Sequence, residues 1–333
     1  MHDRPGPPCL CCGWLAAQHA LAVPRSLLAL VLVGLIAACT PMPAAPPPDA
    51  NAAITYAVVE GVPLDLDVYL PLSDEPHPTV ILVHGGEWQT GDKSDMAALA
   101  EKITQWGYVV FSINYRLAPA YPFPASVADV QCAVAWVREH AAEYGSDSRH
   151  MALVGSEAGG HLAMLAGLAA APTAPPAVWQ PACGEAATDV RAQAIVSISA
   201  PLDLMYYAQE NNRTVTNATV LLGVPCQAAT DVCTSASPIT YVTADAPPTL
   251  LIHGTTDHSV SHENSERMRA ALQSVGAAVT YLPIAGAQHN FILHLDTPEA
   301  QAAVEAIRVF LEALGPPPAA RSPAAVPRGA APG

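Results

Sequence analysis

The feature that most constrains this chain is the regular alternation, between residues 52 and 315, of short apolar runs with longer segments of helical periodicity. Apolar runs without strict polar alternation are typical of parallel strands covered on both faces. Strands that alternate with helices predict an α/β fold with a mostly parallel, doubly wound sheet. The expected strands contain Val80–Val83, Val109–Ser112, Ala152–Val154, Ala194–Ser197, Thr249–Ile252 and Val279–Leu282. The expected helices contain Ser126–Tyr144, Gly159–Ala171, Ser261–Gly276 and Pro298–Leu314.

The loop after the first of these strands carries consecutive glycines. It reads His84-Gly85-Gly86-Glu87-Trp88, and glycines let backbone amides face inward without a Cβ in the way, as an oxyanion hole requires. A tight glycine turn is the alternative interpretation. The pocket is expected to be bordered by His84, as a hydrogen-bonding residue of the loop, and by Trp88, as a wall. Glu87 is either a variable position or a charge at the pocket mouth.

Three further loops carry the pattern of a hydrolase. Ala152–Val154 runs into Gly155-Ser156-Glu157-Ala158-Gly159 and then into a helix, and small residues at both ends of such a segment permit the sharp strand-to-helix turn called the nucleophile elbow. Asp257 follows the strand at Thr249–Ile252, and His289 follows the strand at Val279–Leu282. The order elbow, acid, histidine is that of the α/β-hydrolases.

Taken together, residues 52–314 resemble the α/β-hydrolase superfamily, in its hormone-sensitive-lipase-like and acetyl-esterase or feruloyl-esterase-like (BD-FAE-like) branch. Two further blocks, 114–125 and 236–242, also resemble segments of that branch. The resemblance implies a sheet of about eight strands with small cap insertions. It also implies hydrolysis of small carboxylic esters without a cofactor.

The same resemblance implies roles for particular residues. The amides of Gly85, Gly86 and Ala158 would form the oxyanion hole. Asp257 would orient His289, which would act as the base. No metal site is predicted, because neither HExxH nor a paired Cys/His spacing is present.

The chain departs from the family pattern at the elbow, where Glu157 stands in the place of the nucleophilic serine. Ser156 is the alternative nucleophile, but a turn shifted by one residue would put the β-branched Val154 at a crowded position. Ser156 is therefore expected to point away from His289. Glu157 and Asp257 together are expected to raise the pKa of His289, because two anions stabilise the imidazolium.

Glu157 leaves three readings of the site open. The first is the ester hydrolase that the resemblance implies, with Glu157 in the place of its nucleophile. The second is a catalytically impaired pseudo-hydrolase that binds an ester-like or carbohydrate ligand. The third is a hydrolase that uses Glu157 as a carboxylate nucleophile or as a water-positioning group. A carboxylate that attacks an sp³ carbon gives an alkyl ester, whereas attack on a carboxylic ester gives a less favourable anhydride.

Charge argues against nucleic acid as a partner. The chain has 14 basic and 29 acidic residues and a net charge of −15, so it repels phosphate backbones and anionic headgroups. The expected partner is a small-molecule ester substrate.

The N-terminal segment predicts export. Leu27–Ala38 is apolar but too short to span a bilayer core. With Arg25 before it and Ile36-Ala37-Ala38-Cys39 at its end, it resembles a bacterial lipoprotein signal, and an ordinary signal peptide is the alternative. We therefore expect a leader at 1–38, lipidation of Cys39 as the only membrane contact, a Pro-rich tether at 39–51, the hydrolase domain at 52–315 and a disordered tail at 316–333. The chain would be an envelope lipoprotein or secreted.

Cysteine spacing is consistent with an oxidising compartment. Behind Cys39 remain Cys132, Cys183, Cys226 and Cys233, an even number. Cys226 and Cys233 are close enough for a local disulfide, which leaves Cys132 and Cys183 as a possible second pair. Four free thiols are the alternative.

Overall fold

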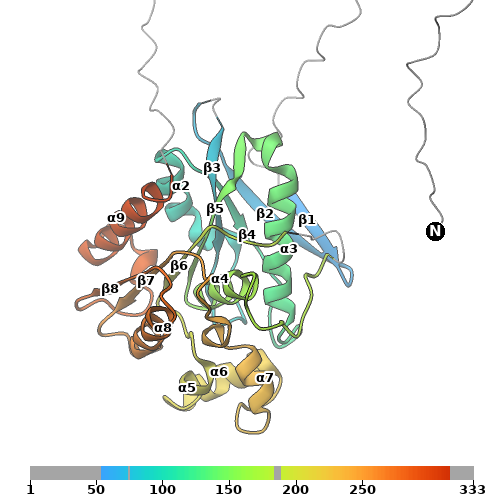
Figure 1. Ribbon diagram of the computed structural model, residues 1–333, viewed down its shortest axis with the longest axis vertical. Coiled ribbons are helices and arrows are strands. Elements are labelled where there is room, and N and C mark those ends of the chain that lie inside the picture. The colour runs from blue at the N-terminus through green and yellow to red at the C-terminus, as the bar shows by residue number, and fades with distance from the viewer. Residues whose placement is uncertain (1–53, 74–75, 184–188, 316–333) are drawn as a thin grey trace, which may run out of the picture. The chain divides into compact units, whose positions relative to one another are not determined.

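The computed structural model describes residues 54–73, 76–183 and 189–315, which contain one eight-stranded sheet with helices on both faces (Figure 1). The strand order is β1-β2-β4-β3-β5-β6-β7-β8. The strands β1 and β2 are antiparallel to each other, and β2 is antiparallel to β4, whereas all other pairs are parallel. The α/β-hydrolase fold class is therefore confirmed. The leader, Cys39, the tether and the tail lie outside the described residues.

The elements have the following bounds. The strands are β1 (Ile54–Val59), β2 (Val62–Tyr69), β3 (His77–Val83), β4 (Val109–Ile113), β5 (Ser146–Ser156), β6 (Ala194–Ile198), β7 (Thr249–Gly254) and β8 (Val279–Ile284). The α-helices are α2 (Ala97–Gln105), α3 (Ala125–His140), α4 (Ala158–Ala169), α5 (Leu204–Tyr207), α6 (Asn212–Leu222), α7 (Thr230–Ser235), α8 (Glu263–Ser274) and α9 (Pro298–Glu312). Short 3₁₀ turns are η1 (Lys93–Met96), η2 (Ala141–Tyr144), η4 (Pro238–Tyr241) and η5 (Phe291–Leu293).

The central strands are buried on both faces, as their apolar runs predict. Successive residues of β3 alternate between two cores: Ile81 packs with α3 and α4, and Leu82 packs with α2 and α9 on the opposite face. Helix α4 follows the elbow and is buried from Ala158 to Leu168. A helix that is apolar all round is buried all round, so α4 is held firmly against the sheet.

The described residues contain two disulfides. Cys226 and Cys233 have Cα atoms 5.2 Å apart, as expected for a local bridge, and Cys132 and Cys183 have Cα atoms 5.5 Å apart. The first bridge lies in the insertion that contains α5, α6 and α7, which projects from one end of the domain (Figure 1). Among the described residues, no helix has the length and apolar character needed to cross a membrane.

Candidate active site

The turn between β5 and α4 has the backbone of a nucleophile elbow. Glu157 has φ 56° and ψ −118°, a left-handed region that is strained for a residue with a side chain. Glycine is required on either side of it. A Cβ on Gly155 would lie 2.2 Å from the carbonyl oxygen of Gly159, and one on Gly159 would lie 2.0 Å from that of Val83. The elbow predicted at 155–159 is therefore present, with Glu157 at its apex.

The carboxylate of Glu157 is bound by backbone amides of the glycine loop. Its Oε2 accepts hydrogen bonds from the amide of Gly86 at 2.6 Å and from the amide of Glu87 at 2.7 Å. Both residues have positive φ, 106° and 57°. Successive inward-facing amides of this kind form an anion-binding concavity. Glu157 is only 4% exposed, and these two amides are the hydrogen-bond donors to its carboxylate among the described residues.

The donors to this carboxylate are not the full set of amides expected for an oxyanion hole, Gly85, Gly86 and Ala158, which stays a prediction. The second donor is the amide of Glu87 rather than that of Gly85, because the left-handed backbone turns the Gly86 and Glu87 amides toward the same point. Gly85 instead provides space, since a Cβ there would lie 3.1 Å from Glu157 Oε2. The Ala158 amide makes no hydrogen bond to the carboxylate within the described residues.

His289 and Asp257 form the expected pair. His289 Nδ1 lies 2.7 Å from Asp257 Oδ2, and Asp257 Oδ1 accepts hydrogen bonds from the amides of Ser259 and Val260 at 2.9 and 3.0 Å. Burial raises the pKa of Asp257, but hydrogen bonds from His253 and His289 outweigh it and hold the pKa below the usual range. Asp257 is therefore an ionised group that fixes the orientation of His289.

Glu157 affects the pKa of His289 through its charge, whereas no effect of Ser156 on that pKa is found. Burial lowers the pKa of His289, but the hydrogen bond and charge of Asp257 and the charge of Glu157 outweigh it, so the pKa is raised, in the direction expected. Neither Glu157 nor Ser156 hydrogen-bonds to His289 within the described residues. Glu157 thus acts on His289 through its charge, because its carboxylate is turned into the oxyanion loop. Ser156 is the buried last residue of β5.

Two residues expected around the pocket lie behind the loop. Trp88 is fully buried and donates from Nε1 to His161 Nδ1 at 3.1 Å, so it supports the loop and is not an open wall. His161 in turn donates to the carbonyl oxygen of Ala236 at 2.8 Å, and burial lowers its pKa to about 4. His84 is 1% exposed and donates from Nδ1 to Gly85 O at 2.7 Å, which is the hydrogen-bonding role expected for it.

Arg213 was not found by sequence reasoning. It belongs to the first turn of α6 and forms an ion pair with the side chain of Glu87. Its positive charge lowers the pKa of His289. The pair connects the insertion to the oxyanion loop, and no local sequence signal could have joined residues so far apart. In the described part of the chain, no group of three or more His, Cys, Asp or Glu side chains is placed to hold a metal ion.

The sequence of this chain is similar to those of known esterases. The BD-FAE family model matches residues 66–272. Esterase LipC of Mycobacterium tuberculosis is 35% identical over 249 residues, which are 71% of this chain and 58% of LipC. Esterase LipQ of the same organism is 35% identical over 247 residues, 70% of this chain and 55% of LipQ. The chain thus spans a little over half the length of these curated relatives.

The fold is also similar to that of solved esterases. A thermophilic esterase of Thermogutta terrifontis with butyrate bound superposes with a TM-score of 0.67 at 25% identity, over 80% of this chain and 95% of that one. The esterase 2 of this organism phosphorylated by paraoxon superposes with the same TM-score, identity and coverage.

Proposed function

This chain belongs to the BD-FAE family of α/β-hydrolases, and from that premise we propose that it hydrolyses small carboxylic esters at a rate restrained by its own Glu157. The observation that carries the restraint is the pair of hydrogen bonds from the Gly86 and Glu87 amides to Glu157 Oε2. The esterase relatives support the reaction class.

The restraint follows from what an oxyanion hole does. During ester hydrolysis the carbonyl oxygen of the substrate gains negative charge, and donors at about 2.7–3.1 Å stabilise it. Here Glu157 Oε2 occupies the two donors at 2.6 and 2.7 Å. An ester carbonyl can reach them only after the carboxylate has left, so Glu157 competes with the substrate as an internal carboxylate. In support, the Thermogutta esterase, which has a similar fold, has been solved with the carboxylates butyrate and propionate bound.

Turnover then proceeds without a covalent intermediate. Once an ester replaces the Glu157 carboxylate at the Gly86 and Glu87 amides, His289 takes a proton from a water molecule, whose oxygen attacks the carbonyl carbon. The tetrahedral intermediate expels the alkoxide, and His289 returns the proton to it. Asp257 stabilises the imidazolium in between. Glu157 can hold the water through Oε1, which accepts no hydrogen bond within the described residues.

The test is p-nitrophenyl acetate hydrolysis by the wild type and matched variants. Glu157→Ser restores a nucleophile and empties the hole, so kcat/KM should rise by at least about 100-fold, because nucleophile and base act as a unit. Glu157→Ala empties the hole without a nucleophile and should give a much smaller gain. His289→Ala in the Glu157→Ser background should remove the gain. A folded Glu157→Ser protein with no gain contradicts the restraint, and a fast wild type inactivated by Ser156→Ala assigns the nucleophile to Ser156.

A covalent probe distinguishes the alternative roles of Glu157. The Thermogutta esterase is phosphorylated by paraoxon, and we expect the Glu157→Ser variant to gain one phosphoryl adduct by intact mass, at position 157, while the wild type gains none. A stable ester on Glu157 after incubation with an alkylating substrate would instead identify the carboxylate as a nucleophile. A wild type that binds p-nitrophenyl acetate without any turnover would identify a pseudo-hydrolase.

A further inference from the structure

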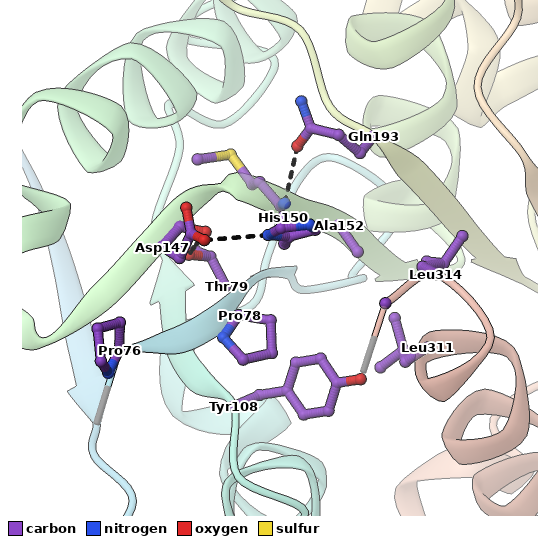
Figure 2. Close-up of a pocket in the computed structure, with 12 residues that line it drawn as sticks. Pro76, Pro78, Thr79, Tyr108, Asp147, His150, Ala152, Gln193, Leu311 and Leu314 are labelled. Atoms are coloured by element: carbon purple, nitrogen blue, oxygen red, sulfur yellow. Dashed lines mark hydrogen bonds and ion pairs between the residues drawn. The ribbon is translucent and has the colours of Figure 1, made fainter. Parts of the chain in front are cut away.

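A cavity lies at the amino ends of the central strands, opposite the carboxyl ends that carry the candidate active site. It has a volume of about 220 Å³ and opens between the amino ends of β3 and β5 and the last turn of α9 (Figure 2). Strand β5 connects the two places: Asp147, near its start, lines the cavity, and Ser156, at its end, precedes Glu157. Because the cavity and the elbow are at opposite ends of an eleven-residue strand, the cavity is not the ester site.

The walls of the cavity are mostly apolar and fit one ring. Pro78, Leu311 and Leu314 line it, together with the ring of Tyr108 (Figure 2). Met151 also lines it. An engineered apolar cavity of about 150 Å³ binds benzene, so 220 Å³ accommodates a single ring with a small substituent. A flat ring packs well against the proline and tyrosine rings.

The hydroxyl of Tyr108 provides a polar anchor. Tyr108 is 4% exposed and lines the cavity, yet its hydroxyl makes no hydrogen bond within the described residues. The hydroxyl is not among the fully enclosed polar atoms of the described residues that lack a partner, so it is accessible from the cavity. Burial, assisted by the charge of Glu312, raises the pKa of Tyr108 to about 12. The hydroxyl therefore keeps its proton at neutral pH and can both donate and accept.

The residues that line the cavity favour an uncharged ligand over an anion. The residues that line it include no Lys or Arg, whereas Asp147 contributes a carboxylate. Hydrogen bonds from Arg149 hold the pKa of Asp147 below its usual range, and His150 Nδ1 lies 3.0 Å from Asp147 Oδ2 at the rim (Figure 2). Asp147 is thus paired with Arg149 and His150, and an anion in the cavity would find no unpaired Lys or Arg among the lining residues.

We propose that this cavity binds a small uncharged ring compound with one hydroxyl group, of the phenol class, whose hydroxyl pairs with that of Tyr108. The ring contacts Pro78, Leu311 and Leu314, and the hydroxyl takes the position that the protein leaves unpaired. Ester hydrolysis at Glu157 and His289 does not require this cavity, so each of the two proposals can fail without affecting the other.

The test uses the full chain, with phenol as the probe and benzoate as the charged control. Phenol should bind with a Kd of about 1 mM, as expected for a ligand of this size, measured by ligand-observed NMR titration, while benzoate should not bind. Tyr108→Phe keeps the ring and removes only the hydroxyl, so it should weaken phenol binding about five-fold, the equivalent of one hydrogen bond of about 1 kcal/mol. Leu314→Trp should fill the cavity and abolish binding.

Several results would overturn the proposal. They are no binding of phenol to the wild type, equal affinities for phenol and benzoate, or an unchanged affinity in Tyr108→Phe. Binding that survives in Leu314→Trp would place the phenol elsewhere on the protein. Thermal unfolding of each variant without ligand provides the folding control, and Glu157→Ser should bind phenol as the wild type does.

Discussion

Replacing Glu157 by glutamine should lower the stability of the fold, because the carboxylate is part of the structure that holds the oxyanion loop. It accepts two hydrogen bonds of 2.6 and 2.7 Å from backbone amides. Hydrogen bonds to charged groups contribute about 1.5–3 kcal/mol each, against about 1 kcal/mol for neutral ones. The lost charge therefore weakens both bonds, while the lower cost of burying a neutral amide offsets part of the loss. We expect a net destabilisation of about 1–2 kcal/mol.

Thermal unfolding at pH 7 measures this effect. For a domain of roughly this size, about 1 kcal/mol corresponds to 2–4 °C in Tm, so Glu157→Gln should unfold about 2–8 °C below the wild type. Glu157→Ala removes the acceptor altogether and should unfold at a lower temperature still. Glu87→Gln is the matched control: it removes the exposed ion pair with Arg213 but keeps the Glu87 amide, and should cost less than about 1 kcal/mol.

Added acetate tests whether the bound carboxylate is the cause of the stability difference. In Glu157→Ala the two amides are free to bind an external carboxylate, and acetate at 100 times its Kd would stabilise the folded state by about 2.7 kcal/mol. Acetate should therefore raise the Tm of Glu157→Ala and leave that of the wild type unchanged. If Glu157→Gln and Glu157→Ala unfold at or above the wild-type temperature, the carboxylate does not stabilise the loop and the reasoning is refuted.

Three further outcomes are expected. By NMR titration the raised pKa of His289 should fall in Glu157→Gln, because one of its two anionic neighbours is lost. Since the folded-state pKa of His289 is raised, protonation of His289 stabilises the fold fully below about pH 6.5. That stabilisation is lost as the pH rises through the folded-state pKa. Gly159→Ala should cost about 3 kcal/mol or more or prevent soluble expression, because its Cβ would meet a backbone oxygen at 2.0 Å; a wild-type Tm would contradict this. Asp129→Asn should cost about 3–5 kcal/mol in urea denaturation, because Asp129 is fully buried against Arg116 at 2.9 Å; a loss below 1 kcal/mol would count against it.

The fold could be predicted from the sequence because burial on both faces leaves a strong mark on parallel strands. The runs around Val80–Val83 and Ala152–Val154 lie in β3 and β5 as expected. Strands β1 and β2 were not located, although β2 alternates clearly, with Leu64, Leu66 and Val68 buried. Its signal is that of an antiparallel strand. The continuous apolar runs that mark buried parallel strands do not include this segment.

The sequence predicts those parts of the site that depend on the course of the backbone. The elbow and the pairing of His289 with Asp257 follow from chain order and from loops at one sheet edge. The direction of the Glu157 side chain does not, because it depends on torsions and on the positive φ of Glu87, which no sequence pattern specifies. The glutamate side chain is longer than that of the serine expected at this position, so its carboxylate reaches the amides of Gly86 and Glu87. It therefore lies at the proposed oxyanion hole and makes no hydrogen bond to His289 within the described residues.

An occupant that is part of the chain has an effective concentration. A tethered group is present at its site at millimolar levels or above, whatever the dilution of the protein, and Glu157 is held by a turn that fixes its backbone. An external carboxylate would have to exceed that local concentration before it could be detected in the wild type. Phosphorylating reagents that label the serine of esterases should also leave this protein unlabelled, because position 157 carries the occupant and no serine.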